Sequence, residues 1–327
     1  MARLNRGREI AAQFLFQICH GLIVAHSCED TPVSKLKALA GAALVTGATV
    51  GWWGYRHGAR DFRLVRQQVP NRKVALRILH ISDLHLGKHN RALARWLPGL
   101  ASLRPDLVVV TGDSLSGRDS VGGVLDVLEP FFAFPGVMVG GSHDYYEPRV
   151  INPFKYLRGP SKVVEHRPEM PWRSLKTAVQ IAGWHWLENS AVSMSIGGVT
   201  VNVAGVDDAH YGRDDSAKAI GELRELGDSA DVVLGVAHAP YLRVVDTLAE
   251  AKVDLILSGH THGGQIRLPR VGSLVTNSDL PNKYSKGLAR YQGGTWLHVS
   301  AGLGTSPFAP IRIGCPPEAT LLELTPN

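Results

Sequence analysis

Polar side chains with metal-binding or acid–base chemistry follow six apolar runs of this 327-residue sequence. They are Asp83, His85, Asp113, Ser142, His143, Asp144, Asp207, Asp208, His238, His260 and His262. Carboxylate oxygens and neutral imidazole nitrogens are the ligands suited to borderline divalent ions such as Mn, Fe, Co and Zn. Two such ions roughly 3.5–4 Å apart can hold a phosphate group and activate a water molecule. The residue types therefore predict a metal site with a chemistry directed at phosphorus.

The elements that must position these residues are short strands. The runs 76–82, 106–112, 136–141, 199–206, 231–238 and 254–260 are rich in β-branched residues, and 91–103 and 215–226 have helical spacing. This alternation predicts an α/β domain with a largely buried sheet. In such sheets ligands bind beyond the carboxyl ends of the strands. A single aspartate after a strand is more often a turn or helix cap, but so many together favour a metal site.

Five short motifs carry a resemblance to a known family. They are ISDLHLG (81–87), TGDS (111–114), GSHD (141–144), AHAP (237–240) and SGHTHGGQ (258–265). In this order they resemble the motifs of calcineurin-like metallophosphoesterases, and the resemblance covers residues 75–325. The ending at 302–324 is similar to that of a bacterial membrane-associated branch. The resemblance implies a four-layer α-β-β-α sandwich of two mixed sheets and hydrolysis of phosphoester or pyrophosphate bonds.

The resemblance also implies a centre of two divalent ions (Mn, Fe, Zn or Co). The implied ligands are Asp83, His85, Asp113, His238, His260 and His262. Of these, Asp113 would bridge the two ions, and His238 and His260 would hold the second ion. The remaining three would hold the first ion.

The motif GSHD supplies the implied catalytic residues and one departure from the family. A hydroxide between the ions would attack phosphorus, His143 would protonate the leaving oxygen, and Asp144 would orient His143. The family normally has an asparagine ligand of the second ion where this chain has Ser142. The hydroxyl can coordinate directly, act through a water molecule, or leave the second site weak or empty. We expect a weakened second site that is still filled at adequate metal concentration.

Several other polar residues have two interpretations each. Asp208 is a candidate substrate contact or the N-cap of a following turn. Arg312 is a candidate partner of a substrate phosphate, or a brace of the C-terminal loop, which we favour. His80 and His298 lie inside strand patterns, so we expect them to be buried and not to bind metal.

The N-terminal quarter differs in charge from the rest of the chain. Residues 1–77 contain 12 Lys/Arg and 4 Asp/Glu, whereas the remaining 250 residues contain 23 and 25. We expect a basic, amphipathic segment at 1–37 and a membrane-anchor candidate at 38–55, which has no charged residue and for which a packed helix is the alternative. A basic linker at 56–74 and a catalytic domain at 75–327 follow. Because basic residues are more numerous after 38–55 than before it, we expect the catalytic domain in the cytoplasm.

These patterns limit the partners. The catalytic part is nearly neutral, so we expect no nucleic acid, and the basic segment suits an anionic membrane surface. We therefore expect a membrane-associated hydrolase of phosphorylated, lipid-linked substrates. The alternatives are a soluble-type phosphodiesterase or nuclease, and a non-catalytic scaffold with a degenerate metal cleft, for which Ser142 is the support.

Overall fold

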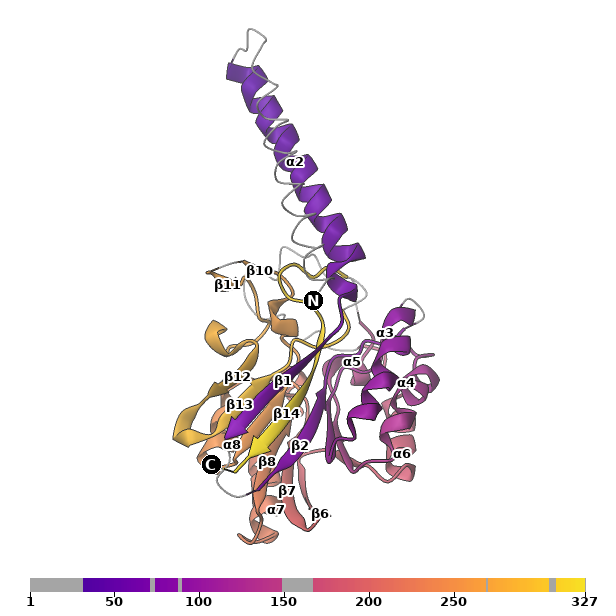
Figure 1. Cartoon of the computed structure of the whole chain (residues 1–327), viewed down its shortest axis with the longest axis vertical. Coiled ribbons are helices and arrows are strands. Elements are labelled where there is room, and N and C mark those ends of the chain that lie inside the picture. The colour runs from indigo at the N-terminus through magenta and orange to yellow at the C-terminus, as the bar shows by residue number, and fades with distance from the viewer. Residues whose placement is uncertain are drawn as a thin grey trace. The chain divides into compact units, whose positions relative to one another are not determined.

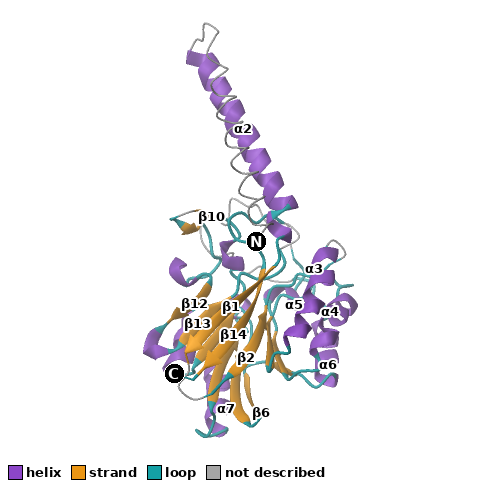
Figure 2. Ribbon diagram, in the orientation of Figure 1, coloured by secondary structure: helices purple, strands orange, loops and turns teal. Residues whose placement is uncertain are grey.

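The computed structural model of the chain describes residues 32–70, 74–87, 90–148, 167–268, 270–305 and 310–326. The chain divides into two units, at 1–50 and 51–327, and the boundary lies within helix α2 (Pro32–Arg56). Most of the segment expected at 1–37 lies outside the described residues. The strands and the remaining helices belong to the second unit (Figures 1 and 2).

Three strands of the first six-stranded sheet are each followed by one of the motifs. In spatial order it comprises β1 (Arg63–Pro70), β14 (Glu318–Thr325), β2 (Leu76–Ile81), β3 (Leu107–Thr111), β4 (Gly136–Val139) and β5 (His185–Leu187). Strands β2 to β5 run parallel, and β14 is antiparallel to β2. Their carboxyl ends therefore lie along one edge of the sheet.

The second six-stranded sheet carries the other motifs. In spatial order it comprises β12 (Gly287–Arg290), β13 (Trp296–Val299), β9 (Leu255–Ser258), β8 (Val232–Ala237), β7 (Val199–Val206) and β6 (Ser190–Ile196). The four central strands are parallel, and both edge strands are antiparallel to their neighbours. A two-stranded hairpin, β10 (Arg267–Leu268) with β11 (Gly272–Ser273), stands apart from both sheets.

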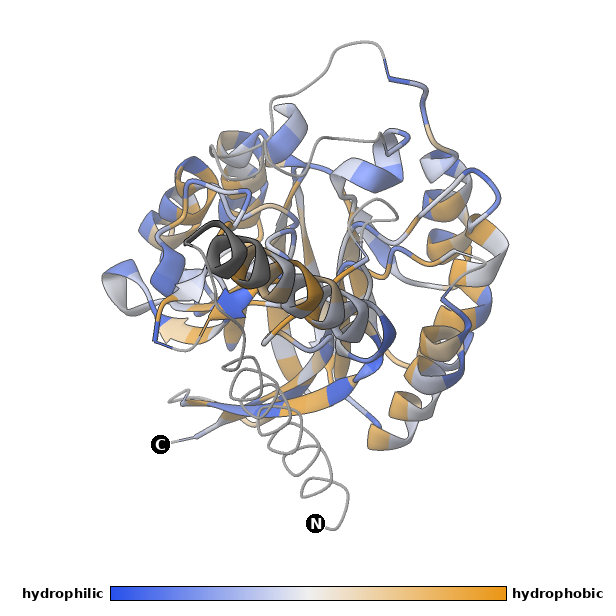
Figure 3. Cartoon of the chain, turned by 90° about the horizontal axis from the view of Figure 1, so that it is seen from above, coloured by the Kyte–Doolittle hydropathy of each residue, from blue (hydrophilic) through white to orange (hydrophobic). Residues whose placement is uncertain are grey.

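Helices cover the outer face of each sheet. The first sheet carries α3 (Arg91–Trp96), α4 (Val121–Leu128) and α6 (Trp172–Ile181), and the second carries α7 (Ser216–Glu225) and α8 (Leu242–Glu250). Short helical turns fill the connections: α5 (Ser142–Tyr145), η1 (Gly58–Arg60), η2 (Leu97–Leu103), η3 (Glu129–Phe131), η5 (Ala209–Tyr211), η6 (His262–Gly264), η7 (Asn282–Tyr284) and η8 (Gln292–Gly294). Figure 3 shows helices on two outer sides of the strands, with hydrophobic and hydrophilic residues alternating along them.

Three apolar clusters hold the layers together. One lies between the helices α3, α4 and α6 and the first sheet, one between the two sheets, and one between the second sheet and the helices α7 and α8. Along β2, Leu79 and Ile81 face the helices while Ile78 faces the other sheet, as the two-residue period of a strand requires. The expected four-layer sandwich of two mixed sheets is confirmed.

The segment after α2 differs from the expected linker. Residues 63–70 form β1, which pairs with β14 at the edge of the first sheet. Arg66 and Gln68 both reach Glu323 on β14, so polar residues that suggested a linker serve as cross-strand contacts. The charge of the segment concealed a strand whose buried residue is Val69. Among the described helices, none has the length and hydropathy required to cross a membrane.

Candidate metal centre

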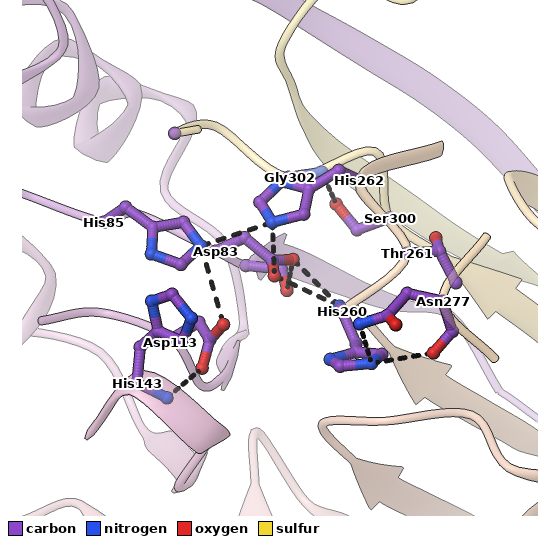
Figure 4. Close-up of polar contacts among 12 residues, drawn as sticks. Asp83, His85, Asp113, His143, His260, Thr261, His262, Asn277, Ser300 and Gly302 are labelled. Atoms are coloured by element: carbon purple, nitrogen blue, oxygen red, sulfur yellow. Dashed lines mark hydrogen bonds and ion pairs between the residues drawn. The ribbon is translucent and has the colours of Figure 1, made fainter. Parts of the chain in front are cut away.

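The loops that follow the central strands of both sheets bring the predicted residues together. Asp83 and His85 follow β2, Asp113 follows β3, and His238 and His260 follow β8 and β9. Figure 4 shows the side chains of Asp83, His85, Asp113 and His260 close together, with His262 and His143 beside them. Strand direction explains this convergence, because parallel strands end at the same edge.

The first cluster of ligand atoms is formed by Asp83, His85 and His262, which we call the first-ion group. The Nε2 atoms of His85 and His262 are 3.2 Å apart, and His262 Nε2 is 3.7 Å from Asp83 Oδ1. All three side chains are largely or fully buried. Two imidazole nitrogens and one carboxylate oxygen that converge in this way fit a divalent ion.

The carboxylate of Asp113 lies between this group and a second one. Its Oδ2 is 3.5 Å from His85 Nε2, and its Oδ1 is 3.4 Å from His238 Nε2. The backbone N–H of His143 donates to the same Oδ1 at 2.8 Å. The two oxygens thus face different imidazoles, which is the arrangement of a bridging ligand.

His238 and His260 form the second-ion group. His238 Nε2 and His260 Nδ1 are 3.2 Å apart. The opposite ring nitrogens contact carbonyl oxygens: His238 Nδ1 that of Thr111 at 2.6 Å, and His260 Nε2 that of Asn277 at 3.1 Å. A carbonyl oxygen only accepts, so these contacts favour protons on the outer nitrogens and facing lone pairs for an ion; at His260 Nε2 the carbonyl contact is shorter than that of the Asn277 amide nitrogen, which lies at 3.3 Å. No motif of the sequence indicated Asn277 as a residue that orients His260.

The backbone of the expected ligands is unusual. Five of them have a positive φ: Asp83 (51°), His85 (39°), Asp113 (52°), His260 (66°) and His262 (50°). Non-glycine residues adopt this conformation rarely, at a cost of order 1–3 kcal/mol each. Strained residues of this kind gather at functional sites, where the surrounding fold holds them.

Burial and charge set the protonation of the centre. Burial lowers the pKa of His85 to about 3 and places those of His260 and His262 well below the usual value. Although burial alone would raise the pKa of Asp113, the His238 and His143 charges hold it well below its usual range. Before an ion binds, the centre therefore contains an ionised Asp113 and neutral His85, His260 and His262. Despite burial, the neighbouring carboxylates, Asp113 foremost, raise the pKa of His238 well above its usual value, so that an ion must displace its proton.

Ser142 makes a contact that the sequence did not indicate. Its hydroxyl, 3% exposed, donates to Asp208 Oδ2 at 3.0 Å. The Asp208 carboxylate also caps η5, since it accepts from the backbone N–H groups of His210 and Tyr211. Burial raises the pKa of Asp208 to about 6. The position of the family's asparagine is thus occupied by a hydroxyl–carboxylate pair, and the cap that we considered for Asp208 is present.

His143 lies beside the first-ion group. Its ring meets the ring of His85 edge to face, with centroids 4.7 Å apart. The side chain is partly exposed, and its buried Nδ1 has no hydrogen-bond partner among the described residues. Burial lowers the pKa of this imidazole below 6.5. The residue can therefore approach a bound group from the open side of the centre.

Asp144 differs from its expected role. We expected its carboxylate to orient His143, but the hydrogen bonds described for it come from the backbone N–H groups of Ser114, Leu115 and Gly141, at 2.8, 2.9 and 3.0 Å. It thus ties the turn after Asp113 to the start of α5. Burial and the Asp113 charge raise the pKa of this carboxyl to about 7.

Arg312 and Asp207 lie near the centre with partners of their own. The Arg312 side chain is fully buried and donates to the carbonyl oxygens of Ala301 (2.7 Å) and Gly304 (2.6 Å), and its Nη2 lies 3.3 Å from His262 Nδ1. This is the geometry of a brace for the C-terminal loop. Asp207 pairs with Arg213 at 2.9 Å and accepts from Tyr145 at 2.6 Å.

This chain is similar to known proteins. The family model described as calcineurin-like phosphoesterase matches residues 76–264. The uncharacterized metallophosphoesterase YkuE of Bacillus subtilis is 28% identical over 299 residues, 88% of this chain and 93% of YkuE. A transmembrane protein with metallophosphoesterase domain from Danio rerio is 26% identical over 92% of this chain and 66% of its own length.

Similarity to solved structures is weaker. The NAD nucleotidase NadN of Haemophilus influenzae matches with a TM-score of 0.41 and 13% identity, over 71% of this chain and 46% of NadN. The family assignment depends instead on the family model, whose matched residues 76–264 include Asp113 and the candidate ligands of both ion groups. The chain belongs to the calcineurin-like phosphoesterase family.

Proposed function

We propose that this chain is a metal-dependent hydrolase of phosphoester or phosphoanhydride bonds that acts on substrates at a membrane surface. The observation that supports it most is the position of Asp113, whose two oxygens face His85 and His238 at 3.5 and 3.4 Å. Family membership supports the metallophosphoesterase class. The substrate and the membrane surface are inferences from the residues around the centre.

The residues of the chain have separate roles in this reaction. Two divalent ions, when bound, supply Lewis acidity and acidify water. The carboxylates and imidazoles of the two ion groups hold these ions and fix their separation. His143 delivers a proton to the leaving oxygen, since its partly exposed ring lies against His85. Because burial lowers its pKa, this proton is available mainly on the acidic side of neutrality.

Exposed apolar side chains on two segments support the membrane proposal. They are Trp52, Trp53 and Tyr55 at the end of α2, and Leu268, Val271 and Leu274 in and after the β10–β11 hairpin, and we call these six residues together the apolar rim. The exposed residues Arg56, Arg60 and Arg270 add positive charge. Aromatic side chains next to basic ones suit the interface of an anionic membrane.

The apolar rim is connected to the centre through residues 311–313. The Arg312 N–H donates to Gly54 O at 3.4 Å, and Ile313 exchanges backbone hydrogen bonds with Gln265 and Arg267. The Arg312 side chain also contacts His262 of the first-ion group. A lipid-linked substrate held at the rim would therefore present its phosphate close to the ion ligands.

The hydrolase proposal is tested with the full chain and added Mn²⁺. Phosphate monoesters, diesters, a single-stranded oligonucleotide and nucleotide-linked lipids are the substrates, and metal content is measured in parallel. We expect two ions per chain, hydrolysis by the wild type and by the surface control Asp126→Asn, and none by Asp113→Asn. A chain that binds no ion and hydrolyses nothing would instead be the scaffold, and preference for the oligonucleotide would make it a nuclease.

The membrane proposal is tested by flotation with vesicles of phosphatidylcholine, with and without phosphatidylglycerol. We expect the wild type to float with the anionic vesicles and the double variant Trp52→Ser/Trp53→Ser to float less. Ile181→Ser, which removes an 82%-exposed apolar side chain of α6, is the matched control and should behave as the wild type. Equal flotation of all three proteins would contradict the role of the rim.

A further inference from the structure

A chain of buried side-chain hydrogen bonds runs from the second sheet to the metal ligand Asp83. His298 Nδ1 on β13 is 2.8 Å from His80 Nδ1 on β2, and His80 Nε2 is 2.8 Å from Thr111 Oγ1. The Thr111 hydroxyl donates to Ser82 Oγ at 2.7 Å, and Ser82 donates to Asp83 Oδ2 at 2.6 Å. All five side chains are at most 1% exposed. We call this series the His298–Asp83 chain.

Which atom donates each hydrogen bond follows from Asp83, the last residue of the His298–Asp83 chain. An ionised carboxylate only accepts, so the single proton of Ser82 is used on Asp83. Ser82 must then accept from Thr111, whose own proton is used in turn. Thr111 therefore accepts from Nε2–H of His80.

The histidines continue the same order. A neutral imidazole has one N–H, so the Nδ1 of His80 accepts from Nδ1–H of His298. The remaining nitrogen, His298 Nε2, has no hydrogen-bond partner among the described residues, as expected of a lone pair at the start of a donor series. Burial lowers the pKa of His298 to about 3 and that of His80 well below its usual value, so both rings are neutral.

We propose that His80, Thr111 and His298 are positioning residues that act through Ser82 to hold Asp83 in its metal-binding orientation. Each donor polarises the next, so the hydroxyl that reaches Asp83 is a stronger donor than an isolated serine. Asp83 Oδ2 is held by this bond, and Oδ1 faces His262 Nε2. The proposal rests on the proposed function in one respect, namely that Asp83 binds the first ion.

The apolar surroundings of the His298–Asp83 chain indicate that its residues do more than fill space between the sheets. Aliphatic side chains, among them Ile78, Val109 and Leu257, line much of the layer between the sheets. Buried imidazoles are costly unless hydrogen-bonded, and here both rings are bonded, with only His298 Nε2 left without a partner among the described residues. Thr111 also connects the two ion groups. Its carbonyl oxygen contacts His238 of the second-ion group, and its hydroxyl is part of the His298–Asp83 chain, which ends at the first-ion group.

Thr111→Val tests the proposal, since it removes the hydroxyl and retains the β-branched shape and the carbonyl contact to His238. Thr320→Val is the matched control: Thr320 lies opposite His80 on β14, is fully buried, and its Oγ1 has no partner among the described residues. Thr111→Ser restores the hydroxyl. We expect Thr111→Val to weaken binding of Mn²⁺ at one of the two sites about tenfold, and the other two variants to bind as the wild type.

A second readout needs neither metal nor turnover. In the metal-free full chain, ¹⁵N NMR should show His298 protonated at Nδ1 and His80 at Nε2, and Thr111→Val should change the His80 signal. The opposite tautomers in the wild type, or equal Mn²⁺ affinity of Thr111→Val and Thr320→Val, would overturn the proposal.

These readouts separate the two proposals. Tautomers and affinities as expected, without hydrolysis of any phosphate ester, would support the positioning role and contradict the hydrolase. Hydrolysis together with equal Mn²⁺ affinities of Thr111→Val and Thr320→Val would support the hydrolase and contradict the positioning role. A wild type that binds no divalent ion would contradict both.

Discussion

The Ser142 hydroxyl donates a 3.0 Å hydrogen bond to the carboxylate of Asp208, which follows a strand of the opposite sheet. The pair occupies the position where the family resemblance implies an asparagine ligand of the second ion. With its proton directed at Asp208, the Ser142 oxygen keeps its lone pairs available. We therefore expect a hydroxyl and a buried carboxylate to support the second-ion group in place of an amide.

Ser142→Asn should tighten binding of the second ion. The amide oxygen of asparagine is a better neutral ligand than a hydroxyl, and its NH₂ group can still donate to Asp208. We expect about a tenfold gain in affinity at one site, about 1.4 kcal/mol, measured by calorimetric titration with Mn²⁺. An unchanged or weaker affinity would mean that Ser142 and Asp208 already provide what the asparagine would.

The loss of kcat/KM on replacement of His143 should depend on the leaving group of the substrate. If the imidazole protonates the leaving oxygen, His143→Gln should lower kcat/KM for alkyl phosphate esters by a factor of about 10²–10⁴. p-Nitrophenyl esters should be affected far less, because p-nitrophenolate leaves without a proton. Equal losses for both ester types would show that His143 binds the phosphate and does not act as the acid.

Asp144→Asn should destabilise the fold. The carboxylate accepts from three backbone N–H groups, and an amide must turn its own NH₂ toward at least one of them. An unsatisfied buried donor costs about 1–3 kcal/mol, which urea unfolding can measure. The exposed Asp126→Asn is the control and should stay within about 0.5 kcal/mol of the wild type. If the unfolding free energy of Asp144→Asn also stays within about 0.5 kcal/mol of the wild type, the role of this carboxylate in the two turns is contradicted.

Stability at low pH should depend on His298. Burial lowers its pKa to about 3, whereas the unfolded chain protonates it near 6.5, so folding stability is lost as pH falls through this window. Between pH 7.5 and 5 the metal-free wild type should lose about 2 kcal/mol more than His298→Leu does. Equal losses in the two proteins would mean that the His298 imidazole becomes protonated without unfolding.

The gathering of the candidate ligands could be predicted from the sequence because each motif comes directly after a strand. The ends of parallel strands meet, so Asp83, Asp113 and His238 could be grouped without knowledge of the packing. The strand β1 was missed because Arg63 and Arg66 suggested a linker, whereas their side chains lie at an exposed sheet edge.

Contacts between the two sheets could not be predicted in the same way. Ser142 meets Asp208 and His80 meets His298 only because the sheets pack face to face in one register. Nothing in the local sequence fixes that register. The orienting role of Asn277 depends likewise on a loop that folds back over His260.

A bridge between two ions through Asp113 can be detected by electron paramagnetic resonance of the Mn²⁺-loaded chain. A carboxylate shared by two Mn²⁺ ions couples their spins, so the wild type should give the spectrum of a coupled pair with two ions per chain. Asp113→Asn should lose the coupled spectrum, and Asp126→Asn should keep it. A wild-type chain that shows only isolated Mn²⁺ at full loading would contradict the bridged centre.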